Sequence, residues 1–144
     1  DRYFKGCRNV IMSRNERGGP MGKKKILIID DVADFTKLIK RNLELTGQYE
    51  VRTENSGRLG LAAAKEIKPD LILLDIAMPD MDGYEIASAI RDDKALKNTS
   101  IIFITGQDLD SKSIQERISK LGAYGYINKP CDFQDILEKI KEAF

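Results

Sequence analysis

The 144-residue chain contains no histidine, so the commonest general base and the commonest metal ligand are missing from any chemistry it performs. Only two cysteines are present, Cys7 and Cys131, and their spacing fits neither a metal site nor a redox motif. We therefore expect free thiols in a reducing cytoplasm. No apolar run approaches the ~20 residues that a membrane span needs. The N-terminal segment also lacks the apolar core of a signal peptide.

The formal net charge of +1 hides an uneven distribution of charge. Residues 1–25 carry eight Lys or Arg against two Asp or Glu, a net +6, and the remainder carries 16 against 21, a net −5. A basic tail can contact nucleic acid or membrane. However, this segment shows no apolar periodicity and contains the breaker run Gly18-Gly19-Pro20. We therefore interpret residues 1–23 as a disordered basic leader or a cloning remnant, and expect one folded domain over residues 24–144.

Five short apolar runs suggest five strands. They are Ile26–Ile29, Tyr49–Thr53, Leu71–Leu74, Ile101–Ile104 and Tyr124–Ile127. The first, third and fourth runs show no alternation of apolar and polar residues, which is typical of central parallel strands buried on both faces. The second run alternates more, so we expect it nearer an edge of the sheet.

The segments between and after these runs show helical spacing, because their apolar residues recur at steps of three and four. The five stripes are Phe35, Leu38, Ile39 and Leu43; Leu59, Ala62, Ala63 and Ile67; Tyr84, Ala87 and Ile90; Ile114, Ile118 and Leu121; and Phe133, Ile136, Leu137, Ile140 and Phe144. Ser56 and Asp132 stand at predicted helix N-caps, and Gly47 and Gly122 at predicted left-handed C-terminal positions. Strict alternation of strand and helix predicts an α/β fold with a parallel sheet covered on both faces.

Polar side chains follow four of the five predicted strands. Asp30 and Asp31 follow the first, Asp75 the third, Thr105 the fourth, and Lys129 lies just after the fifth. In open α/β sheets, ligands bind beyond the carboxyl ends of the strands. Any one of these residues alone is most often a helix cap or a plain loop residue. Their occurrence together at successive strand ends predicts a single site.

The chemistry of such a site follows from its charges. Two carboxylates ~5 Å apart repel each other by about 3 kcal/mol at an effective dielectric constant of ~20. Mg²⁺, a hard cation that prefers carboxylate, water and phosphate oxygens, would remove this repulsion. Asp75 could then attack phosphorus and form an acyl phosphate. Lys129 would bring positive charge to the phosphoryl oxygens, and the Thr105 hydroxyl could donate a hydrogen bond to one of them. Pro130 holds Lys129 in extended backbone and permits a cis peptide bond.

These residues together resemble the receiver domain of two-component response regulators, over about residues 24–144. The matching stretches are Ile28–Asp31, Leu73–Glu85, Phe103–Gly106 and Gly122–Pro130. The resemblance implies a flavodoxin-like, doubly wound five-stranded parallel sheet in the order 2-1-3-4-5 with five helices. It also implies a cytoplasmic signalling switch that takes a phosphoryl group from a sensor histidine kinase or phosphotransfer protein.

The resemblance further implies individual roles. The phosphoacceptor is Asp75, and the metal ligands for Mg²⁺ are Asp30, Asp31, Asp75 and the backbone carbonyl of Ala77. Thr105 and Lys129 assist the phosphoryl group, and Thr105 and Tyr126 form the switch. The implied output is a change in the surface of the fourth helix, fifth strand and fifth helix, which meets a downstream protein or an output domain. No direct nucleic-acid or membrane binding is implied for this domain.

Three alternatives remain at this point. A phosphatase of the haloacid-dehalogenase type also uses Asp, Thr and Lys, but it needs a second acid two residues after its nucleophile, where this chain has Ala77. A flavin-binding module of flavodoxin type needs a phosphate loop after the first strand, where this chain carries Asp30 and Asp31. The chain is either a stand-alone regulator or a receiver module excised from a larger regulator or hybrid kinase.

Overall fold

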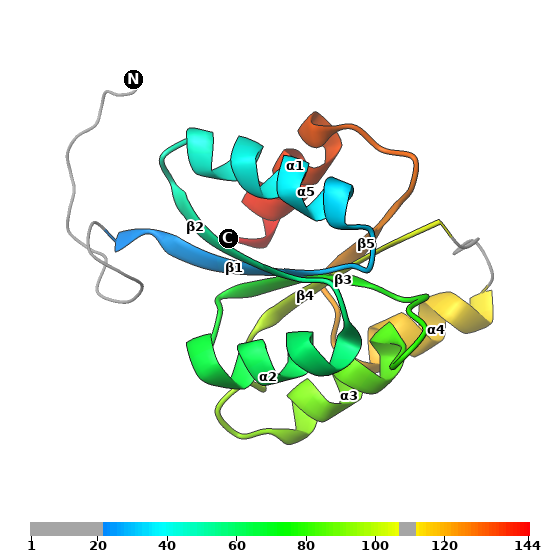
Figure 1. Ribbon diagram of the computed structural model, residues 1–144. Coiled ribbons are helices and arrows are strands. Elements are labelled where there is room, and N and C mark those ends of the chain that lie inside the picture. The colour runs from blue at the N-terminus through cyan, green and yellow to red at the C-terminus, as the bar shows by residue number, and fades with distance from the viewer. Residues whose placement is uncertain (1–21, 107–111) are drawn as a thin grey trace.

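The computed structural model describes residues 22–106 and 112–144, so the predicted basic leader lies outside the described residues except at its last two positions. Strands and helices alternate along the chain (Figure 1). The strands are β1 (Lys24–Ile29), β2 (Tyr49–Glu54), β3 (Leu71–Asp75), β4 (Ser100–Thr105) and β5 (Gly125–Asn128). The helices are α1 (Ala33–Leu45), α2 (Gly57–Ile67), α3 (Gly83–Asp92), α4 (Lys112–Lys120) and α5 (Phe133–Ala143). Within the described part of the chain, no helix combines the length and apolar character needed to cross a membrane.

All five strands are parallel and lie in the order β2-β1-β3-β4-β5, which confirms the predicted fold class. Helices α1 and α5 cover one face of the sheet, and α2, α3 and α4 cover the other (Figure 1). In the pairing of β1 with β3, Ile29 lies opposite Leu74, and in that of β4 with β5, Thr105 lies opposite Asn128. The carboxyl ends of these strands therefore lie at the same end of the sheet, which brings together residues that are far apart in the sequence.

The unbroken apolar strands are buried on both faces, as predicted. Ile26 and Ile28 of β1 belong to the core beneath α1 and α5, whereas Leu27 and Ile29 belong to the core beneath α2, α3 and α4. Successive side chains of a strand point to opposite faces, so a strand covered on both faces has no polar positions. Strand β2 lies at an edge of the sheet, as its alternating pattern indicated.

Three of the predicted helical stripes are partly wrong, and in the last of them Phe144 is 44% exposed. Leu38 and Leu59 are 56% and 59% exposed, and Ala62 is exposed as well. Helix α2 instead faces the sheet through small residues, and a Cβ at Gly60 would lie 2.6 Å from the side chain of Ile29. The helix backbone thus lies too close to β1 for larger side chains, and the buried stripe is displaced from the leucines.

The predicted helix ends are confirmed. The Ser56 side chain accepts a hydrogen bond from the N–H of Leu59 at 3.2 Å, and Asp132 caps α5. Gly47 and Gly122 follow α1 and α4 with φ of 78° and 70°, values that favour glycine. The helices therefore begin and end where local chemistry dictates, which fixes the loops between strands and helices.

Candidate functional site

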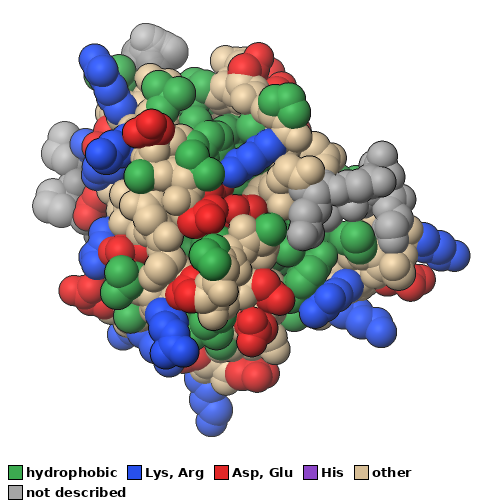
Figure 2. All heavy atoms as spheres, turned by 45° about the vertical axis from the view of Figure 1, so that its right-hand side comes forward, with side chains coloured by type: hydrophobic (Ala, Val, Ile, Leu, Met, Phe, Trp, Pro, Cys, Tyr) green, Lys and Arg blue, Asp and Glu red, His purple; other side chains and the backbone are tan. Residues whose placement is uncertain are grey.

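The three aspartates converge at the carboxyl end of the sheet. One carboxylate oxygen from each of Asp30, Asp31 and Asp75 can be chosen so that all three lie within 4.8 Å of one another. Asp75 ends β3 and the acidic pair follows β1, its neighbour in the sheet. Figure 2 brings this side of the molecule forward and shows acidic side chains gathered there beside a basic one. The predicted convergence of the three carboxylates is confirmed.

Asp30 is fixed by its neighbours and has no solvent-exposed surface. Its carboxylate accepts a hydrogen bond from the N–H of Val32 at 2.9 Å, and its own N–H donates to the carbonyl of Glu54 at 3.1 Å. Asp31 is exposed. The pair therefore offers one buried, oriented ligand and one that meets solvent.

Asp75 is 5% exposed, and burial raises the pKa of this carboxyl from 3.8 to about 6. The negative charges of Asp30 and, more weakly, Asp31 push the same pKa upward. Lys129 and the N–H of Ala77 act in the opposite direction, because both stabilise the ionised form. Burial and the neighbouring acids together thus outweigh the stabilisation of the ionised Asp75 by Lys129 and the N–H of Ala77.

Lys129 follows β5 and contacts the acidic cluster from there. Its Nζ lies 2.6 Å from Oδ2 of Asp30 and 4.5 Å from the centre of the Phe35 ring. Its backbone N–H donates to the carbonyl of Thr105 at 2.8 Å, and the Lys129–Pro130 peptide bond is cis. The structure thus brings Lys129 to the site by pairing it with Asp30.

Thr105 and Tyr126 lie on neighbouring strands. Thr105 ends β4 and is 1% exposed. Tyr126 lies opposite Phe103, and both pack in the core on the α4 side of the sheet. Because side chains alternate along a strand, Thr105 projects to that same face. The Tyr126 hydroxyl is 3.5 Å from Nε2 of Gln115 in α4, so Tyr126 borders this helix.

The loop that follows Asp75 is tightly closed. The N–H of Gly83 donates to the carbonyl of Ile76 at 2.8 Å, and a Cβ at Gly83 would collide with the backbone oxygen of Asp75. Ala77 is exposed within this loop. The geometry leaves the carbonyl role of Ala77 as a prediction.

Sequence reasoning missed two polar residues beside the site. The side-chain amide of Asn55 donates to the carbonyl of Asp30 at 2.8 Å. The Asp80 carboxylate accepts hydrogen bonds from the N–H groups of Gly57 and Arg58, at 2.9 and 3.0 Å. Asn55 carried a usable signal, since it belongs to the polar residues 54–56 that follow the predicted second strand. For Asp80 the only signal in the sequence is that the residue lies in an acidic loop.

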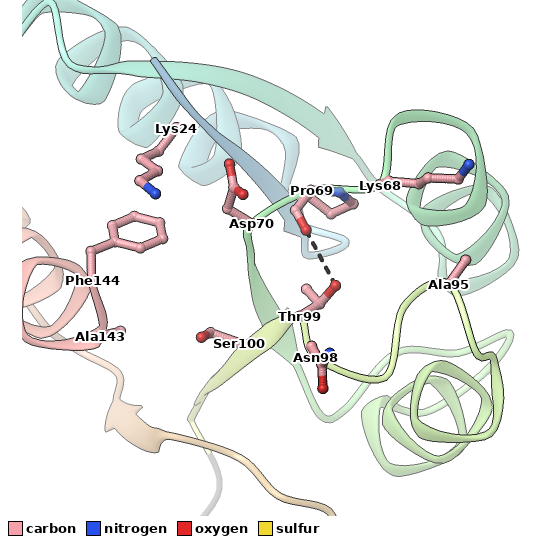
Figure 3. A pocket seen from close by; sticks show the side chains of 10 residues that line it. All are labelled: Lys24, Lys68, Pro69, Asp70, Ala95, Asn98, Thr99, Ser100, Ala143 and Phe144. Carbon is pink, nitrogen blue, oxygen red and sulfur yellow. Dashed lines mark hydrogen bonds between the residues drawn. The ribbon is translucent and has the colours of Figure 1, made fainter. Parts of the chain in front are cut away.

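A separate hollow of about 430 Å³ lies at the other end of the sheet, where the strands begin (Figure 3). Two of its polar side chains join separate chain segments. The Thr99 hydroxyl donates to the carbonyl of Pro69 at 3.2 Å, and Asp70 accepts from the N–H of Lys25 at 2.8 Å. Lys24 lies over the Phe144 ring at 5.4 Å. The hollow is distant from the three aspartates and contributes nothing to their chemistry.

The residues present fit a magnesium ion. The donors are carboxylate oxygens, which Mg²⁺ prefers, and two of the three carboxylates are almost fully buried. Lys129 pairs with Asp30, and the pKa of Asp75 is still raised, by burial first and by the charge of Asp30 second. A hard divalent cation is the species that such a cluster accommodates best.

Comparisons with known proteins agree with this arrangement. Residues 26–141 match the family model of the response regulator receiver domain. The polar-differentiation response regulator DivK of Brucella anthropi is 35% identical over 118 residues, covering 82% of this chain and 94% of DivK. The structure of Vibrio cholerae chemotaxis protein CheY4 has a TM-score of 0.78 at 30% identity, covering 85% of this chain and 99% of that one. A CheY-like receiver domain protein from Methanospirillum hungatei has a TM-score of 0.76 at 35% identity, covering 83% and 92% of the two chains.

Proposed function

The chain belongs to the family of response regulator receiver domains, and from this premise we propose that it is a phosphoacceptor switch with Asp75 as its acceptor. The observation that carries the proposal is the meeting of Asp30, Asp31 and Asp75 within 4.8 Å. The phosphoryl donor is a phosphohistidine on a sensor kinase or a phosphotransfer protein. The product is an aspartyl phosphate whose charge changes the protein surface.

The transfer step needs an ionised Asp75. A carboxylate oxygen of Asp75 forms a bond to phosphorus while the bond from phosphorus to the donor imidazole nitrogen breaks, and that nitrogen takes up a proton from water. Because the pKa of Asp75 is about 6, most of the acceptor is ionised at neutral pH even without a bound cation. The chain thus acts as a phosphoacceptor that promotes its own phosphorylation and dephosphorylation, rather than as an enzyme that turns over an external substrate.

Asp30, Asp31, Asp75 and the backbone carbonyl of Ala77 would hold Mg²⁺. When bound, this ion supplies positive charge that offsets the repulsion between the carboxylates and the phosphoryl oxygens. Lys129 then exchanges its contact with Asp30 for one with a phosphoryl oxygen. Its side chain is long and flexible, so the ammonium group can make this short move.

The switch rests on Thr105 and Tyr126. The aspartyl phosphate offers acceptor oxygens near the end of β4, and the Thr105 hydroxyl turns to donate to one of them. The space it leaves is filled by Tyr126, which gives up its contact with Gln115 in α4. One charge-assisted hydrogen bond of about 1.5–3 kcal/mol shifts the ratio of the two states roughly 10- to 100-fold.

The partners follow from this cycle. A histidine kinase or phosphotransfer protein meets the carboxyl end of the sheet. A downstream protein, or an output domain on a longer chain, meets the surface of α4, β5 and α5. The family's function needs neither nucleic acid nor membrane at this domain, and we place the protein in the cytoplasm. A phosphatase of the haloacid-dehalogenase type is disfavoured, because Ala77 cannot protonate a leaving group.

The direct test is phosphorylation by a small donor. Wild type and Asp75→Asn are incubated with acetyl phosphate and Mg²⁺ and followed by intact mass. We expect wild type to gain one phosphoryl group, and expect the gain to disappear in Asp75→Asn and in the presence of EDTA. Asp34→Asn changes an exposed carboxylate at the start of α1 and is the matched control, which should be modified like wild type. Equal modification of Asp75→Asn, or none in wild type, would refute the proposal.

A further inference from the structure

Apart from Asp75, which ends β3, the proposed metal ligands lie on two loops, one after β1 and one after β3. The structure links each of these loops to the β2–α2 junction. The loop after β1 carries Asp30 and Asp31, and the loop after β3 carries Ala77. Strand β3 does not adjoin β2, because β1 lies between them. The links are therefore made by side chains rather than by strand pairing.

The first link runs through Asn55, the residue after β2. Its Nδ2 donates to the carbonyl of Asp30 at 2.8 Å and to the hydroxyl oxygen of Thr36 at 3.1 Å. Thr36 is 1% exposed, and its hydroxyl in turn donates to the carbonyl of Ala33 at 3.0 Å. Asn55 thus holds the peptide between Asp30 and Asp31 against the first turn of α1.

The second link runs through Asp80, in the loop after Asp75. Its two carboxylate oxygens accept hydrogen bonds from the N–H groups of Gly57 and Arg58, at 2.9 and 3.0 Å. These N–H groups belong to the first turn of α2, where the helix dipole also favours a negative charge. Consistent with this, the backbone hydrogen bonds lower the pKa of Asp80. A Cβ on Gly57 would lie 2.7 Å from the carbonyl oxygen of Met81, so loop and helix are in direct contact.

We propose that Asn55 and Asp80 are positioning residues for the Mg²⁺ site, which fasten its two ligand-bearing loops to the β2–α2 junction. Neither residue touches the ion or the phosphoryl group. Asn55 sets the direction of the acidic pair, and Asp80 sets the path of the loop that carries the Ala77 carbonyl. Mg²⁺ demands near-ideal octahedral geometry, so an error of a fraction of an ångström in either loop weakens binding. This inference rests on the proposed function.

The expected effect is a loss of Mg²⁺ affinity. Removing a residue that orients metal ligands typically costs about 10- to 100-fold in affinity. We expect about a 10-fold rise in the Mg²⁺ dissociation constant for each of Asn55→Ala and Asp80→Ala. The conservative variant Asp80→Asn keeps one acceptor oxygen but loses the charge, so its affinity should fall between those of wild type and Asp80→Ala.

Ser56→Ala is the matched control. The Ser56 side chain accepts from the N–H of Leu59 at 3.2 Å and thus caps the same end of α2. Losing this cap costs about 1 kcal/mol of stability, as expected for Asp80→Ala also. Ser56 reaches neither ligand-bearing loop through its side chain, so its loss should leave Mg²⁺ affinity unchanged. A merely structural role for Asp80 would make the two variants alike.

The experiment measures Mg²⁺ binding by calorimetry in wild type and these four variants, after circular dichroism has shown each to be folded. Hydrogen exchange without Mg²⁺ provides a second readout, and should show faster exchange in residues 76–82 for Asp80→Ala but not for Ser56→Ala. If wild type fails to bind Mg²⁺, the proposed function is refuted. Wild type that binds while Asn55→Ala and Asp80→Ala match the Ser56→Ala affinity would overturn the positioning role alone.

Discussion

Replacing Asp75 by Asn should stabilise the protein at neutral pH, although the residue lies at the centre of the site. Asp75 is 5% exposed, and burial together with the Asp30 charge raises its pKa from 3.8 to about 6. The folded state therefore resists ionising this carboxyl. Asparagine has nearly the same shape but no charge. The variant therefore avoids the free-energy cost of a buried negative charge and leaves the packing of β3 intact.

The magnitude follows from the two pKa values. The gap between 3.8 in the unfolded chain and about 6 in the folded state corresponds to about 3 kcal/mol. The folded state binds more protons in this interval, so wild-type stability is highest below 3.8 and falls as the pH rises through 6. Above pH 6 the free energy of unfolding of wild type is reduced by the full amount. Asp75→Asn should therefore be more stable than wild type by as much as 3 kcal/mol at about pH 8, and the difference should shrink toward zero near pH 4.

The assay is urea unfolding followed by far-UV circular dichroism in EDTA, at several pH values between about 4 and 8. Added Mg²⁺ should stabilise wild type much more than Asp75→Asn, because binding to the folded state alone raises its stability. Asp34→Asn, an exposed carboxylate change in the first turn of α1, should show no such gain in stability at pH 8. An Asp75→Asn variant no more stable than wild type at pH 8, or a difference independent of pH, would refute the reasoning.

Four further substitutions, one of them a control, probe the parts of the site separately. Gly83→Ala places a Cβ against the backbone at the end of β3 and should lower thermal stability strongly, whereas Gly106→Ala, whose Cβ would meet nothing within 4 Å, should not. Lys129→Met removes the partner of the buried Asp30 carboxylate; we expect a loss of about 3 kcal/mol in urea unfolding at neutral pH, and an unchanged midpoint would contradict the importance of this ion pair. Thr105→Ala should still accept phosphate from acetyl phosphate, but the amide NMR shifts of β5 should change less on phosphorylation than in wild type; equal changes would remove the hydroxyl from the switch.

The sheet could be predicted from sequence because its signal is local. Ile26–Ile29, Leu71–Leu74 and Ile101–Ile104 are unbroken apolar runs, and a strand buried on both faces has no other pattern available. The convergence of the three aspartates followed from that topology, since the carboxyl ends of parallel strands share one edge. The helix faces were harder, because Leu59 and Gly60 stand next to each other and only the distance between α2 and β1 decides which one is buried.

The interactions around the site could not be predicted in the same way. The Lys129 ammonium pairs with Asp30, which is 99 positions away in the sequence. Asp80 is an exposed acid whose hydrogen bonds depend on where α2 begins relative to the loop after β3. Such contacts are set by tertiary distances of a few ångströms, and neither composition nor periodicity contains them.

The most direct test of the central claim is to locate the phosphoryl group chemically. After incubation with acetyl phosphate and Mg²⁺, borohydride reduces an aspartyl phosphate to homoserine, and peptide mass spectrometry then identifies the modified position. The account predicts homoserine in place of Asp75 and aspartate unchanged at Asp30 and Asp31. Homoserine at either of those two positions, or aspartate retained at all three in protein that has gained a phosphoryl group, would contradict it.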